Sequence, residues 1–234
     1  MNNELNFETF LYIGSNKLRI FSNKNFNEKN IFDEEILIEN QQNVFNFEKL
    51  DQFLKMNVFK LEKVSNNFLE NIFLILDLDV FFPIQISVKK NNNGEEIGIT
   101  NLNYLLNFSK DQCHQTLKDK KIIHMIIDKY IIDGKFFSDL PKNTKCNYFS
   151  LDVSIISLPI HYIIDLEKIL KKYHISLVKI ISADYMKTLF PNNDKELAFM
   201  SRKVIEGYNK NEILFKSKIQ ENKGFFERFF NFFK

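Results

Sequence analysis

The sequence predicts an α+β protein, in which short strands and helices alternate without a repeat period. Two observations lead to this prediction. Runs rich in Ile, Phe, Val and Leu are separated by turn residues, and other segments place apolar residues at steps of three and four, the spacing of one helix face. The chain has 234 residues, of which 44% are hydrophobic. It can therefore bury a core without disulfides or a structural metal, as one domain or two small ones.

The first part of the chain predicts a hairpin, a third strand and a long helix. Strand-forming runs at 10–13 and 18–21 flank Gly14-Ser15-Asn16, a three-residue turn that suits a hairpin. A third strand is expected within 35–39. From Phe47 to Val64, apolar residues recur at helical spacing and predict one amphipathic helix.

The rest of the chain continues the alternation. Further strands are expected at 72–76, 84–88, 122–127, 152–157 and 177–181. Thr100 is the expected N-cap of a helix, and a second helix is expected from about Ile160 to Tyr173, after Pro159. Asp133-Gly134 is expected to form a turn. After Pro191 the pattern weakens, so residues 201–220 are expected to be a linker with at most one weak element.

Net charge and cysteine spacing limit the classes of partner and the redox compartment that we expect. Lys and Arg number 32 against 30 Asp and Glu, a net charge of +2, which disfavours a nucleic-acid binder. Cys113 and Cys146 have no Cys-x-x-Cys spacing, which favours a reduced setting. The longest apolar runs are far shorter than the about 20 residues that a spanning helix needs, so we expect a soluble body.

A search for catalytic motifs predicts no catalytic residues, no metal site and no cofactor. The chain has no Gly-x-Gly, no phosphate-binding Walker loop and no zinc-ligand spacing. His124 lies in an apolar run and is expected to be a hydrogen-bonded core histidine. Asp77 and Asp79 resemble a carboxylate pair, but solvation at a strand end is the favoured interpretation.

The pattern of apolar and polar residues at the end of the chain predicts an amphipathic helix at 221–234. Its six phenylalanines fall within an arc of about 160°, and the polar side chains fall opposite. The apolar face comprises Phe225, Phe226, Phe229, Phe230, Phe232 and Phe233, and the charged face includes Lys223, Arg228 and Lys234. Such a helix is typical of one that lies in a membrane surface. Between Lys210 and Lys234, six Lys and Arg against three Glu favour an anionic leaflet. The alternative is that the helix closes the core or docks on a partner.

The order of these motifs resembles FtsA, the actin-like bacterial cell-division protein, in reduced form. Tyr12-Ile13-Gly14-Ser15-Asn16-Lys17 resembles the first phosphate hairpin of actin-like proteins, and Ile99-Thr100-Asn101-Leu102 resembles the first helix of the subdomain peculiar to FtsA. Ile123-His124, Tyr130 to Gly134 and Pro141 resemble a run within that subdomain. Lys223 to Arg228 resembles the family's terminal membrane helix.

The resemblance implies a particular domain plan. Residues 1–95, rejoined by 184–200, would form a reduced actin-like (ribonuclease H-like) subdomain. Residues 96–183 would form an inserted strand-helix-strand-strand subdomain of the FtsA type. The linker 201–220 and the membrane-targeting helix 221–234 would follow.

The chain also departs from the family. Tyr12 stands where the family has the aspartate that serves metal and nucleotide, and no second phosphate loop follows Met200. The second actin-like lobe is missing, so ATP binding is not carried over. Gly14, Ser15 and Lys17 remain as a vestigial phosphate hairpin, for which a structural role is favoured.

The resemblance implies a non-enzymatic, peripheral membrane adaptor at the division site, on the cytoplasmic face of the bacterial inner membrane. Its partners would be anionic lipids and, through the inserted subdomain, other division proteins or FtsA-like copies. Two alternatives stay open: a nucleotide-binding actin-like protein completed by self-association, and a pilus-assembly actin homologue of the PilM type. A membrane-attached protein with no role in division is a third, plainer interpretation.

Overall fold

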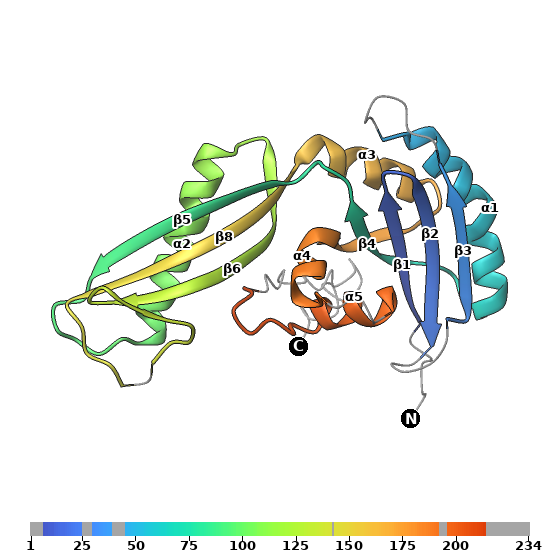
Figure 1. Ribbon diagram of the computed structural model, residues 1–234. Helices are drawn as coiled ribbons and strands as arrows, with labels where there is room; N and C mark the ends of the chain where they lie inside the picture. Colours follow the sequence, from blue (N-terminus) through green and yellow to red (C-terminus); the bar gives the residue numbers. More distant parts are fainter. Residues whose placement is uncertain (1–6, 25–29, 39–44, 142, 192–195, 214–234) are drawn as a thin grey trace, which may run out of the picture.

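The computed structural model describes residues 7–24, 30–38, 45–141, 143–191 and 196–213, which form two β-sheets and five helices (Figure 1). In chain order the elements are β1 (Phe7–Gly14), β2 (Lys17–Lys24), β3 (Phe32–Leu37), α1 (Phe47–Ser65), β4 (Asn71–Asp77), β5 (Phe82–Asn91), α2 (Ile99–Thr116), β6 (Lys120–Ile132), β7 (Lys135–Phe137), β8 (Tyr148–Pro159), α3 (Ile160–Lys171), β9 (Ser176–Ser182), α4 (Ala183–Leu189) and α5 (Leu197–Ile205). The predicted α+β class is confirmed.

The first sheet has five strands in the order β3-β2-β1-β4-β9. Strands β1, β2 and β3 form an antiparallel meander, and the predicted hairpin is confirmed by the pairing of Ile13 with Leu18 across the turn. Strand β1 runs parallel to β4, which runs parallel to β9. The carboxyl ends of these three strands therefore meet at one edge of the sheet.

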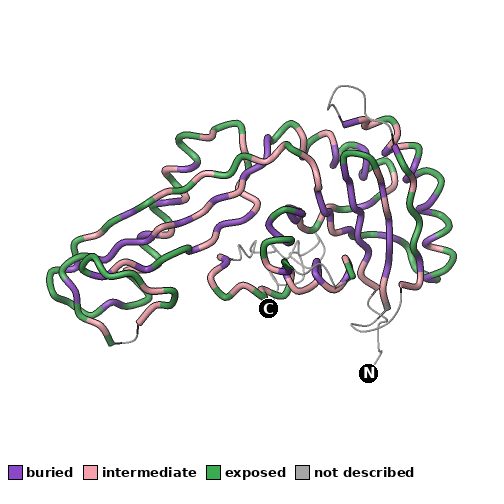
Figure 2. The backbone as a smooth tube through the Cα atoms, in the orientation of Figure 1, coloured by how far each residue is buried: buried purple, intermediate pink, exposed green. Residues whose placement is uncertain are grey.

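Helices cover both faces of the first sheet. Leu11 and Ile13 point to the face where α1 and α3 pack, and Phe10 and Tyr12 point to the opposite face, with α4 and α5. This division follows from the strand period of two, which sends alternate side chains to opposite faces. Figure 2 shows the resulting concentration of buried residues along β1 and the strands beside it. The first sheet is thus the centre of a three-layer core.

The second sheet is antiparallel, in the order β5-β8-β6-β7, and among the described helices α2 packs on one of its faces. Val153 and Ile155 of β8 share a buried cluster with Leu105 of α2. The opposite face carries polar residues, with Ser87 of β5 paired with Asp152 of β8. This sheet extends away from the first one, with α2 on one side only (Figure 1). No described helix lies along the other face, here called the open face, although its Ile126 and Ile156 pack against the cluster around α4.

The division between the two parts differs from the predicted boundaries of 96 and 183. Strand β5 pairs along its whole length with β8, so the second part begins at residue 82. It ends with β8, because α3 packs against the first sheet through residues such as Leu166 and Leu170. Helical and strand periodicity locate elements but do not tell which sheet a strand joins, which is why the boundaries shifted.

The helices predicted at Phe47–Val64, after Thr100 and from about Ile160 to Tyr173 are present, with differences at their ends. Asn46 caps α1, accepting a hydrogen bond from the backbone N–H of Lys49 at 3.0 Å. Thr100 is not the N-cap of α2: the N-cap is Gly98, two residues earlier, and the helix begins at Ile99. The backbone N–H of Gly98 instead donates to the Asn101 Oδ1 at 3.1 Å. That contact fixes the start of the helix.

The predicted linker also begins later than expected. Residues 201–205 belong to α5, and Glu212 is buried. The predicted helix at 221–234, with all its membrane-facing residues, lies outside the described residues. Within the described residues, Cys113 and Cys146 are both free and buried, and no helix has the length and apolarity needed to cross a bilayer.

Candidate functional site

The carboxyl edge of the parallel strands β1, β4 and β9 is one candidate site. Gly14 at the end of β1 pairs with Asp77 at the end of β4, and β9 leads directly into α4. In sheets with parallel strands, ligands tend to bind outside these carboxyl ends. The vestigial phosphate hairpin predicted at Gly14, Ser15 and Lys17 lies at this edge.

Three side chains from different elements close the edge. The Tyr12 hydroxyl of β1 donates to the Asp77 Oδ2 at 2.5 Å, and the Lys187 Nζ of α4 donates to the Asp77 Oδ1 at 2.8 Å. We call Tyr12, Asp77 and Lys187 the edge cluster. The expectation that Asp77 is simply solvated is wrong, because both of its oxygens have protein partners.

Contacts within the edge cluster also shift the pKa values of its three groups. Burial alone would raise the pKa of Asp77, but the hydrogen bonds from Lys187 and Tyr12 hold it below its ordinary value. Burial and the Asp77 bond raise the pKa of Tyr12, and the same carboxylate raises the pKa of Lys187. The phenol stays protonated and the ion pair stays charged at neutral pH. None of the three groups is poised to exchange a proton.

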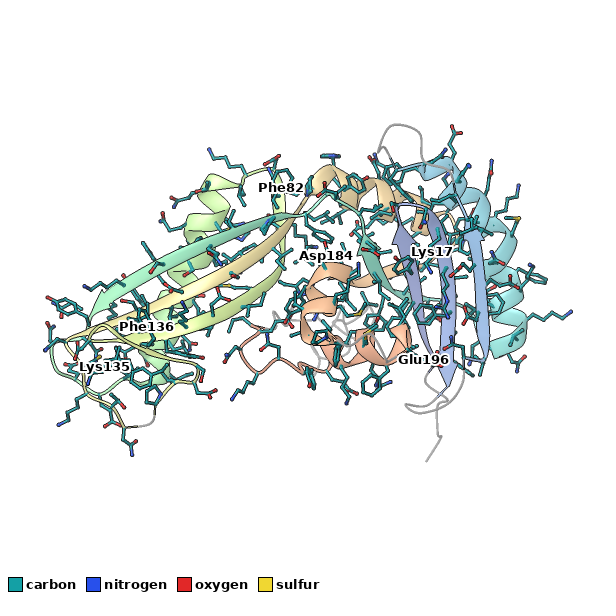
Figure 3. The ribbon with its side chains drawn as sticks, viewed as in Figure 1. Lys17, Phe82, Lys135, Phe136, Asp184 and Glu196 are labelled. Carbon is teal, nitrogen blue, oxygen red and sulfur yellow. The ribbon has the colours of Figure 1, made fainter. Side chains whose placement is uncertain are left out.

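The hairpin residues lie together, but other side chains occupy their surroundings. A Cβ added to Gly14 would lie 2.8 Å from the Tyr12 Cε1, so the tyrosine ring lies directly over the turn. The Lys17 Nζ pairs with Glu35 at 3.1 Å and lies 5.3 Å from the centre of the Tyr12 ring. Figure 3 labels Lys17 at the hairpin end of the first sheet. Tyr12 and Glu35 are thus the described neighbours of Gly14 and Lys17, and the structural role of the hairpin stays a prediction.

A second polar cluster lies where the two sheets meet. The His124 Nδ1 of β6 is 2.8 Å from the Glu212 Oε1, and the Tyr185 hydroxyl of α4 donates to the Glu212 Oε2 at 2.9 Å. Asn209 donates to the Tyr185 oxygen at 3.1 Å, and the Lys179 Nζ lies 3.9 Å from Glu212. We call these five residues the junction cluster.

The bonding pattern fixes the state of His124. The backbone N–H of Ser182 donates to the His124 Nε2 at 3.1 Å, so this nitrogen accepts and the proton of a neutral imidazole lies on Nδ1. Burial lowers the pKa of His124, although Glu212 opposes the shift. Burial would raise the pKa of Glu212, but its hydrogen bond with His124 and the neighbouring Lys179 help hold it low. The pair is a neutral histidine that donates to a carboxylate.

The junction cluster joins distant parts of the chain. His124 and Glu212 are 88 residues apart in sequence. Around Glu212 the chain pairs with the outer edge of β6: the Ile127 N–H donates to the Asn211 carbonyl, and the Ile213 N–H donates to the Met125 carbonyl. The prediction that His124 is a hydrogen-bonded core residue is confirmed. Lys179, Tyr185, Lys187 and Glu212 had no sequence signal, since only the fold gives them partners.

The remaining predicted residues fall in several places. Asp133, with a φ of 46°, and Gly134, with a φ of 80°, form the turn between β6 and β7, as predicted. Asp79 is exposed just beyond β4, as expected for a solvated carboxylate. Within the described residues, no group of three or more His, Cys, Asp or Glu side chains is arranged to hold a metal ion. The membrane-facing residues from Lys223 to Lys234 lie outside the described residues.

Comparisons with known proteins add a distant structural similarity. No family model matches the chain, and no curated protein matches it. A solved structure described as the PilM-PilN type IV pilus biogenesis complex is similar, with a TM-score of 0.48 and 9% sequence identity. The match covers 79% of this chain and 49% of that one, so the chain spans about half the length of its structural neighbour. A similarity this distant carries no functional argument.

Proposed function

We propose that this chain is an FtsA-like scaffold of the bacterial division machinery that attaches to the inner face of the plasma membrane and does not hydrolyse nucleotide. The edge cluster carries the proposal. Tyr12 stands where actin-like proteins have the aspartate that serves metal and nucleotide, and its ring and hydroxyl are committed to Gly14 and Asp77. The hairpin would therefore be retained for its strands, whose Ile13 and Leu18 belong to the core, while its turn residues Ser15 and Asn16 are exposed.

Membrane attachment would come from the tail, residues 214–234. Phe225, Phe226, Phe229, Phe230, Phe232 and Phe233 would enter the boundary between headgroups and acyl chains. Lys223, Arg228 and Lys234 would add attraction to anionic lipids. Partner binding would fall to the second sheet, residues 82–159, whose open face carries polar residues such as Gln85 and Ser87 that are exposed among the described residues. Other division proteins or FtsA-like copies are the proposed partners there.

Vesicle co-sedimentation tests the membrane part of the proposal. Phe226→Glu with Phe229→Glu places two charges in the apolar face and should weaken binding to anionic vesicles by more than about ten-fold. The matched control is Phe59→Glu with Phe68→Glu, which makes the same chemical change at side chains that are exposed on the body. Equal binding by the two double variants would contradict the proposal.

Nucleotide dependence tests the non-enzymatic part. A ligand that binds the folded state raises the unfolding temperature, so ATP with Mg²⁺ at millimolar concentration should leave the thermal transition unchanged. A clear ATP-dependent rise would favour the rival interpretation, a nucleotide-binding actin-like protein completed by self-association. Tyr12→Phe would then show whether the tyrosine hydroxyl takes part in nucleotide binding, since this substitution keeps the ring over Gly14 and removes only the bond to Asp77.

A further inference from the structure

A groove lies between the open face of the second sheet and α4. Its volume is about 450 Å³, within the range of ligand pockets. Its apolar lining includes Phe81, Ile126, Ile156 and Leu189. These residues come from the connection between the sheets, from β6, from β8 and from α4, so the groove exists only because the two parts are held in this arrangement. The junction cluster helps to hold the two sheets in this arrangement, and its residues Tyr185 and Asn209 also line the groove.

Carboxylates surround this apolar lining. Asp79, Asp128 and Asp184 all line the groove and are exposed, and among its lining residues that the structure describes there is no Lys, Arg or His. Asp128 accepts a hydrogen bond from Ser154 at 2.5 Å, while Asp184 lies 3.4 Å from Lys187, a cation already bound to Asp77 at 2.8 Å. Figure 3 labels Asp184 on α4, between the two sheets. The groove thus complements a ligand that is both apolar and cationic.

The tail has this chemistry. Residues 214–234 carry five Lys and Arg against two Glu, together with seven phenylalanines. The other described surfaces offer exposed phenylalanines, such as Phe59 and Phe68, but the groove combines a concave apolar lining with carboxylates that no lining cation balances. Charge and apolarity therefore match the tail to the groove.

The tail also starts beside the groove. Asn209 and Ile126 line it, and Glu212 pairs with Ile126 in an antiparallel bridge. The last described residue, Ile213, is hydrogen bonded to Met125. From there to Phe225 an extended chain spans up to about 40 Å, so reach does not limit docking. A short tether gives an effective concentration of about a millimolar, enough to populate even a weak contact.

We propose that this groove is an intramolecular dock for the Phe-rich basic tail, which holds the tail away from the membrane until an anionic surface competes for it. The inference rests on the proposed function, because it assigns regulation to the same tail. Docking and membrane binding use the same phenylalanines and cations, so they exclude each other. The apparent membrane affinity is then reduced by the fraction of molecules whose tail is free.

A tryptophan reporter tests the docking directly in the full chain. The chain contains no tryptophan, so Phe226→Trp provides a single indole. Without vesicles, its emission should lie at the short wavelengths of a buried indole and should not vary with protein concentration. Asp79→Lys with Asp128→Lys should move the emission to the long wavelengths of a solvated indole. Asp128→Lys also removes the acceptor of a hydrogen bond from Ser154. Asp79→Lys alone leaves that bond in place and should show a smaller shift of the same sign.

Vesicle binding by the same variants measures the competition. If about nine molecules in ten are docked, releasing the tail raises the affinity for anionic vesicles by about ten-fold. The matched control is Glu34→Lys with Asp111→Lys, which changes the net charge equally at exposed sites on β3 and α2. The control should bind as the parent chain does, apart from the general gain in positive charge that both pairs share.

Three results would overturn the inference. One is long-wavelength emission from the Phe226→Trp chain when no vesicles are present and the groove is unchanged. Another is equal emission from the groove pair and the control pair. A third is emission that depends on protein concentration, which would place the tail on a second copy. Each leaves the proposed function intact if vesicle binding still depends on the tail, whereas a chain that binds no anionic vesicles even after the groove substitutions refutes the proposed function itself.

Discussion

The junction cluster and the groove both lie between the two sheets, and they differ in how their charges are satisfied. Glu212 is almost fully buried and accepts hydrogen bonds from His124 and Tyr185. Asp79 and Asp128 are exposed at the mouth of an apolar groove whose described lining contains no cation. A buried charge needs partners, while an exposed one is solvated by water. One half of the contact between the sheets therefore fixes the fold, and the other half remains available for binding.

The largest expected effect is on the junction cluster. Glu212→Ala removes the carboxylate that joins β6, α4 and the segment after α5, and leaves His124 and Tyr185 without their acceptor. The free energy of unfolding should fall by about 3 kcal/mol, because two buried donors, the His124 N–H and the Tyr185 hydroxyl, lose their acceptor. Chemical denaturation measures it. Glu167→Ala, at a residue on the surface of α3 that lies 3.9 Å from Lys171, is the control and should leave stability nearly unchanged. Equal effects of the two substitutions would show that the junction cluster contributes no more to stability than a surface ion pair does.

A pH titration of stability should follow the same cluster. Because the pKa of folded His124 lies below its ordinary value of 6.5, the unfolded chain binds a proton that the folded chain does not. Stability should therefore fall as the pH drops below about 6.5, by up to about 1.4 kcal/mol per pH unit for one proton. The lowered pKa of Glu212 adds a further loss at lower pH, as that carboxylate becomes protonated. His124→Gln should remove most of the slope near neutrality; an unchanged slope would show that other groups cause it.

The smallest expected effects on stability concern Asp77 and Asp79, two carboxylates that lie two residues apart in the sequence. Asp77→Ala removes the acceptor of Tyr12 and Lys187 and should cost about 1 kcal/mol, since solvent partly screens the ion pair. Asp79→Ala should leave the denaturation midpoint unchanged, because Asp79 is exposed at the groove. Denaturation curves of the two variants provide the measurement. A larger loss for Asp79→Ala would mean that the groove carboxylates hold the fold.

The sequence predicted local structure better than it predicted sites. The hairpin at Gly14, the helix from Phe47 and most strands follow from apolar periodicity and turn residues, which are local properties. The boundary at residue 82 could not be read, because the pairing of β5 with β8 joins segments far apart in the chain. Side-chain sites were hidden for the same reason.

Asp77 illustrates how much a site depends on the fold. Its partners Tyr12 and Lys187 are 65 and 110 residues away, and nothing beside Asp77 in the sequence indicates either of them. His124 could be predicted to be hydrogen bonded, since a histidine in an apolar strand needs partners when it is buried. The identity of its partner, Glu212, could not be predicted, because the residues around it read as a linker.

The central claim is that the folded body is a scaffold and that the tail takes it to the membrane. The most direct measurement compares the full chain with a chain that lacks residues 221–234, using co-sedimentation with vesicles that contain anionic lipid. The account predicts that the full chain sediments with the vesicles, less so as salt is raised, and that the shortened chain stays in solution. Equal sedimentation of the two chains would contradict the account.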